Sequence, residues 1–268
     1  MDIKLNYTEK GRGETLILLH GNGENYSYFE NQIDFFAEKY RVIALDTRGH
    51  GESPRGNAPF TIRQFAEDLY EFMREKQIEK AHILGFSDGG NIALCFALKY
   101  PEKVDRLILN GANLDGNGVK PTVQLPIILG YHIARLFSKR SEDAKKNSEM
   151  LGLMVNDPKI KKEELHRLKM KTLVIAGNKD MIKTSHTKLI AENIKGSELV
   201  IMEGDHFIAN KRSGEFNRIV SEFLLSAECR TQNAEWRRTI SKEQPTTRLF
   251  KLGVRSCSIK SSDLIISS

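Results

Sequence analysis

The sequence predicts an α/β fold built around one mostly parallel, doubly wound sheet. Short aliphatic and β-branched runs recur along the chain, and segments with helical periodicity separate them. The runs are continuously apolar rather than alternating, which is typical of strands covered on both faces. The strand–helix–strand order favours parallel pairing through right-handed crossovers. At 268 residues, such a fold buries roughly three quarters of the surface that the unfolded chain exposes, so it requires no disulfide or metal.

The expected elements follow in order along the chain. Six runs are predicted to be strands, namely residues 15–19, 41–45, 81–85, 106–109, 172–176 and 199–202. Five segments are predicted to be helices of the main fold, namely residues 28–39, 61–76, 90–100, 185–194 and 214–225. The second helix begins with Thr61, a favourable N-cap, and Gln64 stands three residues later, as in a capping box.

One long segment interrupts the alternation. After the strand at 106–109, about sixty residues carry no strand signal. Within them 116–121 is predicted to be a loop, and short helices are expected at 126–138, 143–154 and 159–169. The insertion leaves the sheet at the carboxyl end of a strand, where open α/β sheets bind ligands. We expect a small helical cap over a site at about 115–169; the alternative is a set of packing helices without a role in binding.

The C-terminal segment differs from the rest of the chain. Residues 228–268 show no stable period and are rich in Ser, Thr and Arg, so we expect a poorly ordered tail outside a domain at 1–227. This tail has 8 Lys and Arg against 4 Asp and Glu, whereas residues 1–227 have 33 against 31. Most of the net charge of +6 therefore lies in the tail, and we expect no nucleic-acid partner for the main domain.

Several other classes of protein are not indicated. The longest apolar run, 92–98, is far shorter than the roughly 20 residues that span a bilayer, so no membrane partner is expected. The N-terminus lacks a signal-peptide pattern, and the three cysteines lack a paired spacing; both favour a cytoplasmic location. The Gly-rich start at Gly21 has Tyr26 where a dinucleotide fingerprint needs glycine, and neither a P-loop nor a zinc motif is present. We therefore expect no cofactor and no metal.

A candidate nucleophile lies between a strand and a helix. Residues 85–89 read Gly-Phe-Ser-Asp-Gly, directly after the strand at 81–85 and before the helix at 90–100. This context is the one that the G-x-S-x-G motif requires, because a sharp turn there lifts the serine hydroxyl above the sheet edge. Ser87 is predicted to be the nucleophile; the alternative is an ordinary N-cap.

A serine nucleophile needs a base that accepts its proton, and the base needs a carboxylate that orients it and stabilises its charged form. Among seven histidines, His206 follows the last predicted strand and precedes the last helix, so it is the best placed to reach Ser87. Asp180 lies in the loop after the strand at 172–176, at the same edge, whereas Asp205 is adjacent to the histidine and badly placed to bond its Nδ1. His20 and His186 are expected to be structural histidines bonded to backbone.

The oxyanion of an acyl-transfer reaction needs two N–H donors. The backbone of Asp88, directly after Ser87, is predicted to supply one, and the backbone of Asn22, after the first strand, the other. The Asp88 side chain is expected to be solvated or to cap the helix.

Five motifs together resemble the α/β-hydrolase fold family: His-Gly-Asn-Gly at 20–23, Asp-Thr-Arg-Gly-His-Gly-Glu-Ser at 46–53, Gly-Phe-Ser-Asp-Gly-Gly at 85–90, Gly-Asn-Lys-Asp at 177–180 and Gly-Asp-His-Phe at 204–207. The resemblance covers roughly residues 1–227. It implies an eight-strand type of sheet, a nucleophile at Ser87, an acid at Asp180 and a base at His206. It assigns no catalytic role to Arg48 or His50. Serine at the nucleophile position argues against the similar dehalogenase and epoxide hydrolase branches, which use aspartate.

The resulting hypothesis is a serine hydrolase that cleaves a small ester, lactone or thioester through an acyl-enzyme. Its partner is then a small-molecule substrate, and the sequence does not indicate an oligomeric state. Two alternatives are open: the same triad acting in C–C hydrolysis or lyase chemistry, and a ligand sensor on the same fold. Candidate pocket residues from the cap are Ile127, Ile128, Tyr131, Phe137, Leu153 and Met154; each has cap-to-body packing as its alternative role.

Overall fold

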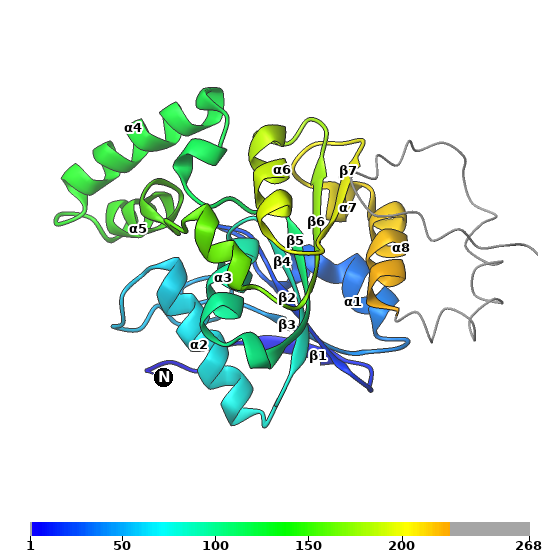
Figure 1. Ribbon diagram of the computed structural model, residues 1–268. Helices are drawn as coiled ribbons and strands as arrows, with labels where there is room; N and C mark the ends of the chain where they lie inside the picture. The colour runs from blue at the N-terminus through cyan, green and yellow to red at the C-terminus, as the bar shows by residue number, and fades with distance from the viewer. Residues whose placement is uncertain (1, 226–268) are drawn as a thin grey trace, which may run out of the picture.

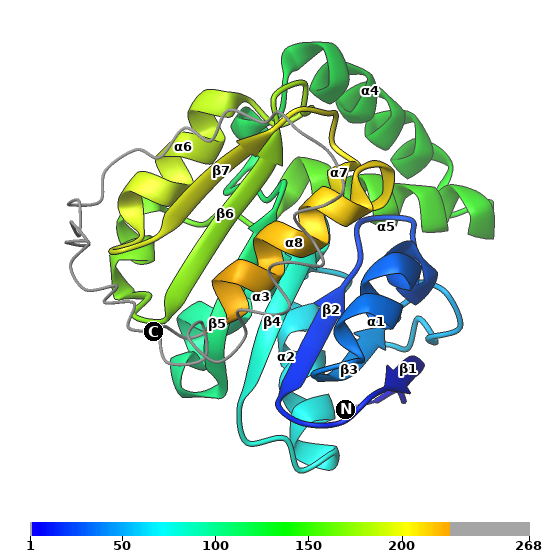
Figure 2. The same ribbon diagram turned by 90° about the vertical axis from the view of Figure 1, so that its right-hand side faces the viewer.

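The computed structural model describes residues 2–225, which form a three-layered α/β structure (Figures 1 and 2). Seven strands make one sheet in the order β1-β3-β2-β4-β5-β6-β7, and every pair is parallel except β1–β3. The bounds are β1 Tyr7–Lys10, β2 Thr15–Leu19, β3 Arg41–Leu45, β4 Ala81–Phe86, β5 Val104–Asn110, β6 Lys171–Gly177 and β7 Glu198–Met202. The predicted fold class and all six predicted strands are confirmed.

The seventh strand was not predicted, and the expected eight-strand sheet is wrong for the described residues. β1 is short, partly exposed and has the polar sequence Tyr-Thr-Glu-Lys, so it lacks the apolar run that marks the other strands. It pairs antiparallel at the outer edge of β3. Only this one strand precedes β2, and so the sheet has one strand fewer than the resemblance implied.

Helices cover both faces of the sheet (Figure 2). The bounds are η1 Tyr26–Phe29, α1 Glu30–Phe36, α2 Ile62–Glu75, α3 Asp88–Lys99, η2 Pro101–Lys103, α6 Thr184–Asn193, α7 Ile208–Lys211 and α8 Ser213–Leu224. Alternate residues of one strand enter two separate cores: Ile17 and Leu19 of β2 belong to the core that includes residues of α2, α3 and α6, whereas Leu16 and Leu18 belong to the core that includes residues of α1 and α8. This two-sided burial explains why the strands read as continuous apolar runs.

Local details differ from the expectations at the helix ends. Thr61 does cap α2, since its hydroxyl accepts a hydrogen bond from the Gln64 backbone at 3.1 Å. The reciprocal half of the capping box is absent, because the Gln64 side chain donates to Asp68 instead. The segment expected to be one helix at 28–39 is a 3₁₀ turn followed by α1, and α7 was not predicted because it is only four residues long.

The insertion after β5 is helical, as expected. It contains η3 Gly116–Gly118, α4 Pro121–Phe137, α5 Glu142–Asn156 and η4 Lys162–Arg167. Helix α4 begins five residues before the predicted start, with Pro121 in its first turn, where the missing proline N–H costs nothing. The expected helix at 159–169 is a 3₁₀ helix instead. α5 is anchored in the core by Leu153, which is 1% exposed, and α4 packs on α5 at the periphery (Figure 1).

Some expectations are not decided by this architecture. The role of the insertion as a cap and the domain bounds 1–227 stay predictions. The tail at 228–268 lies outside the described residues. Of the helices in residues 2–225, none combines the length and the apolar character that crossing a bilayer requires. Within the same residues, no cluster of three or more His, Cys, Asp or Glu side chains is arranged to hold a metal ion.

Candidate active site

Ser87 lies in a strained turn between β4 and α3. Its backbone has φ 54° and ψ −120°, a region that side-chain-bearing residues rarely adopt and that costs on the order of 1–3 kcal/mol. The flanking glycines make the turn possible: a Cβ atom on Gly85 would overlap the Gly89 carbonyl, and one on Gly89 would overlap the carbonyl of Leu19 in β2. The turn therefore brings the start of α3 close to the carboxyl ends of the strands, with the serine at its apex.

Three side chains from distant parts of the chain form a hydrogen-bonded relay. The Ser87 Oγ lies 3.0 Å from His206 Nε2, and His206 Nδ1 lies 2.7 Å from Asp180 Oδ1. Because Nδ1 faces a carboxylate, it carries the proton, and Nε2 then accepts a hydrogen bond from the serine hydroxyl. His206 and Asp180 are 5% and 2% exposed. This geometry is that of a nucleophile, a base and an orienting acid.

Asp180 and His206 are held in place by neighbouring residues. Asp180 Oδ1 also accepts a hydrogen bond from the Ile182 backbone at 2.8 Å, which fixes the carboxylate. Gly111, directly after β5, has φ 63°, and a Cβ there would lie 2.8 Å from His206 Cε1 and 3.3 Å from Asp180 Oδ2. Only glycine leaves room for the imidazole and also favours this backbone conformation. Sequence reasoning missed Gly111; a glycine directly after a strand was the available signal.

Aromatic rings lie beside the imidazole. The Phe86 and His206 ring centroids are 4.8 Å apart, and Tyr28 stacks on Phe86 with centroids 4.4 Å apart and an interplanar angle of 6°. Phe207 also contacts His206 and is 40% exposed. These contacts restrict the orientation of the base and leave one apolar ring at the surface of the site.

The loop after β2 lies close to the nucleophile and carries the first predicted oxyanion donor. Within residues 2–225, the backbone N–H groups of Asn22 and Asp88 donate no hydrogen bond to another protein group. The Asn22 side chain donates to the Met150 carbonyl of α5 at 2.8 Å, which ties this loop to the insertion. His20 stabilises the loop: its Nδ1 bonds Gly21 O at 2.7 Å, and its Nε2 accepts from the Thr47 backbone.

The Asp88 side chain is buried, against the expectation that it is solvated or caps α3. It is 7% exposed, and its Oδ1 accepts a hydrogen bond from Asn91 Nδ2 at 3.3 Å. Asn91 also bonds Asn113 in both directions, so a buried polar network lies beneath the nucleophile turn. Burial raises the pKa of Asp88 to about 6, while the side-chain amides of Asn22 and Asn91 oppose that rise.

Glu24 is a second carboxyl group in the loop after β2, and sequence reasoning missed it. Its Oε2 accepts a hydrogen bond from the Gly21 backbone at 3.1 Å. Burial raises the pKa of Glu24 from 4.5 to about 7, although the Gly21 hydrogen bond and the nearby His206 lower it. The residue has no motif of its own, because its burial depends on how the loop packs.

We expect this carboxyl group to make folding stability depend on pH. Between pH 4.5 and about 7 the folded state holds the Glu24 proton more tightly than the unfolded state, so stability falls as pH rises through this window. The Glu24→Gln variant keeps an acceptor for Gly21 and should not show this component. Urea denaturation at several pH values measures it; the exposed Glu30→Gln is the control, and identical profiles for wild type and Glu24→Gln would contradict the assignment.

Other polar residues considered from the sequence have structural partners. Asp205 pairs with Lys211 and accepts a hydrogen bond from the Phe207 backbone, and it makes no bond to the imidazole. His186 Nε2 accepts a hydrogen bond from the Leu114 backbone at 3.0 Å. The expectation that His20 and His186 are bonded to backbone is therefore confirmed.

The six candidate pocket residues occupy different environments. Leu153 belongs to the main core, and Phe137 is 47% exposed at the end of α4. Tyr131 packs against α5, because a Cβ on Gly152 would lie 3.3 Å from its ring. Ile127, Ile128 and Met154 are partly buried. A substrate-contacting role for Ile127, Ile128, Tyr131, Phe137, Leu153 and Met154 stays a prediction.

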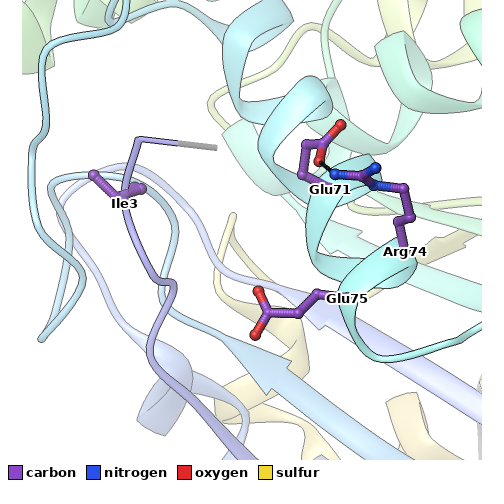
Figure 3. Close-up of a pocket in the computed structure, with 4 residues that line it drawn as sticks. All are labelled: Ile3, Glu71, Arg74 and Glu75. Atoms are coloured by element: carbon purple, nitrogen blue, oxygen red, sulfur yellow. Dashed lines mark hydrogen bonds and ion pairs between the residues drawn. The ribbon is translucent and has the colours of Figure 1, made fainter.

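A separate surface hollow lies away from the relay. Ile3, Glu71, Arg74 and Glu75 line it, between the N-terminal segment and α2 (Figure 3). Arg74 is paired with Glu71 at 2.5 Å, so its charge is already compensated. The hollow is lined by no Ser, Cys or His side chain, and none of the predicted site residues lines it.

Comparison with known proteins gives one consistent result. A family model described as the alpha/beta hydrolase fold matches residues 14–132. The chain is 29% identical over 251 residues to the human serine hydrolase BPHL, covering 83% of each chain. It is 28% identical over 255 residues to 3-oxoadipate enol-lactonase 2 of Acinetobacter baylyi, covering 83% of this chain and 94% of that one.

A solved structure extends the similarity to three dimensions. A meta-cleavage product hydrolase from Pseudomonas fluorescens superposes with a TM-score of 0.68 and 28% identity, covering 82% of this chain and 94% of that one. The matched proteins bear the names of hydrolases with different substrates. The three proteins named here are all hydrolases, and two of their names give different substrates, an enol-lactone and a meta-cleavage product.

Proposed function

This chain belongs to the α/β-hydrolase fold family of enzymes, and from that premise we propose that it is a serine hydrolase that cleaves a small ester, lactone or thioester. The observation that carries the proposal is the continuous relay from Ser87 Oγ through His206 to Asp180, with distances of 3.0 and 2.7 Å. A serine hydroxyl is a weak nucleophile unless such a base accepts its proton.

The proposed reaction has two halves. Ser87 Oγ attacks the carbonyl carbon while His206 Nε2 accepts the hydroxyl proton, and Asp180 stabilises the resulting imidazolium. The backbone N–H groups of Asn22 and Asp88 donate to the negative oxygen of the tetrahedral intermediate. When the intermediate collapses, His206 gives its proton to the leaving alcohol or thiol. A water molecule then attacks the acyl-enzyme by the same route and releases the acid.

The substrate class follows from the chemistry of the site and its relatives. The backbone N–H groups of Asn22 and Asp88, which donate to no other protein group, can bind a carbonyl oxygen. The exposed Phe207 ring offers an apolar contact to the substrate. The similarity to an enol-lactonase supports a cyclic or linear carboxylic ester. The reaction consumes only water, so the proposal needs no cofactor.

Hydrolysis of a C–C bond is the second candidate. The observation that favours it is the similarity to a meta-cleavage product hydrolase, at 28% identity over most of both chains. A conjugated dienone substrate absorbs visible light and loses this absorption on cleavage, whereas simple esters do not. Parallel assays with a dienone and with p-nitrophenyl esters distinguish the two candidates.

Active-site labelling tests the proposed nucleophile. A fluorophosphonate probe should modify the protein, and mass spectrometry should find the adduct on the peptide that contains Ser87, because only an activated serine reacts quickly. The Ser87→Ala variant should remain unlabelled. Labelling at another residue, or equal labelling of the variant, would contradict the mechanism.

A further inference from the structure

Helix α4 exposes a row of large apolar side chains. Leu125, Leu129, Ile133, Leu136 and Phe137 are 65%, 63%, 52%, 76% and 47% exposed. Within residues 2–225, Phe207 beside the active site is the only other large apolar side chain with comparable exposure. The spacing of the five residues follows helical periodicity, so they share one face of α4. We call these five residues the α4 ridge.

The ridge does not face the body of the protein. Other residues of α4 pack on α5: a Cβ on Gly130 would lie 3.3 Å from Leu151, and Gln124 donates a hydrogen bond to the Met154 carbonyl at 3.1 Å. α4 is the outermost helix on this side of the molecule in both views (Figures 1 and 2). An apolar row of this kind on the outside of a protein marks an interaction surface.

The charged side chains of residues 116–141, which include α4, have one sign; the exposed carboxylates of Glu142 and Asp143 begin the next helix. No Asp or Glu occurs between Asp115 and Glu142, whereas four basic residues do: Lys120, Arg135, Lys139 and Arg140. The last three are exposed and lie at the C-terminal end of α4 and just beyond it. No carboxylate of the described chain forms an ion pair with any of the four. The partner of the ridge must therefore combine apolar material with negative charge.

We propose that the α4 ridge docks on an anionic lipid surface. An apolar face bordered by Lys and Arg is the pattern of helices that lie in the plane of a membrane interface, where the apolar side chains insert among the acyl chains and the cations bind headgroups. The expectation that no membrane is a partner considered only spanning segments. The length criterion does not apply to a helix that lies on the surface.

A second copy of the chain fits the same face poorly. A symmetric pair joins identical surfaces. In an antiparallel pair of α4 helices, Arg135 and Lys139 of one copy would approach Lys120 of the other; in a parallel pair, each cation would approach its own counterpart. The helix offers no carboxylate to compensate either arrangement. An anionic surface compensates all of these charges.

Co-sedimentation of the full chain with vesicles tests the proposal. We expect binding to vesicles that contain phosphatidylglycerol, little binding to pure phosphatidylcholine, and weaker binding at high salt. The double variant Leu129→Gln/Ile133→Gln and the triple variant Arg135→Gln/Lys139→Gln/Arg140→Gln should each reduce partitioning roughly tenfold or more. Lys188→Gln removes a single exposed cation from α6, away from the ridge, and should bind like the wild type.

Comparing these variants also distinguishes membrane binding by the α4 ridge from membrane binding by the basic residues of the C-terminal segment. Residues 228–268 have 8 basic and 4 acidic residues and are present in every variant, so a loss of binding in the α4 variants assigns binding to the ridge. Near-ultraviolet circular dichroism checks that each variant is folded. Absence of binding by the wild type, or equal binding by all folded variants, would overturn the proposal. So would a stable dimer without vesicle binding that Leu129→Gln/Ile133→Gln dissociates.

Discussion

Asparagine in place of Asp180 is expected to lower kcat for a short p-nitrophenyl ester by roughly 10⁴-fold. The carboxylate lies 2.7 Å from His206 Nδ1, where it fixes the tautomer of the base and stabilises the imidazolium that forms during attack. Asparagine has nearly the same shape and keeps an acceptor for the Ile182 backbone, which now bonds Oδ1 at 2.8 Å. The variant should therefore fold normally and lose the charge. Steady-state kinetics of both proteins measure the effect.

The neighbouring aspartate provides a matched control. Asp205 adjoins His206 in sequence but pairs with the exposed Lys211 and makes no bond to the imidazole. We expect Asp205→Asn to change kcat by less than roughly threefold, since exposed ion pairs contribute little. Near-normal turnover by Asp180→Asn, or an equal loss in the two variants, would remove Asp180 from the proposed mechanism.

Replacing Arg48 with methionine is expected to reduce the free energy of unfolding by roughly 3–5 kcal/mol. The Arg48 side chain is 0% exposed and bonds both oxygens of Asp68 at 2.7 Å, and Asp68 itself is 3% exposed. Arg48 also donates to Asp2 at 2.6 Å and to the Arg55 carbonyl at 3.0 Å. Removing the guanidinium leaves a buried carboxylate without its cation, which is the most destabilising way to break a buried pair.

Urea denaturation of the purified variants measures this loss. Arg74→Met is the control, because its partner is also a carboxylate but Arg74 is 70% exposed, and we expect a change below about 1 kcal/mol. A loss for Arg48→Met as small as that of the control would contradict a structural role for the buried pair. A normal kcat in the folded fraction of Arg48→Met would agree with the absence of a catalytic role that the sequence resemblance implied.

The location of Ser87, Asp180 and His206 at one edge of the sheet was predictable, because it depends on sequence patterns next to each residue. Ser87, Asp180 and His206 each follow a strand that reads as an apolar run, and parallel strands bring their carboxyl ends to one edge. The glycines around Ser87 mark the sharp turn in the sequence itself. In the same way, the six strands with apolar runs were visible, whereas β1 was not, because its sequence is polar and its residues are partly buried or exposed.

The features that escaped prediction depend on contacts between distant segments. Gly111 is necessary because an imidazole from residue 206 occupies the space of its missing side chain; the local sequence shows a glycine directly after a strand but not which distant residue lies there. Glu24 and Asp88 are ordinary carboxylate residues in the sequence, yet packing half-buries Glu24, buries Asp88 and raises the pKa of each. Leu153 and Leu129 are both apolar residues of the insertion, but one is 1% exposed in the core and the other 63% exposed on the ridge.

The sequence by itself determined the order of strands and helices, the nucleophile turn and the three residues of the relay. These depend on apolar periodicity and on turn chemistry, which act over a few neighbouring residues. Only the tertiary structure decided which polar groups are desolvated, which glycines make room for the base and which face of α4 stays uncovered. Burial and proximity arise when segments far apart in the chain pack together, so no local pattern records them.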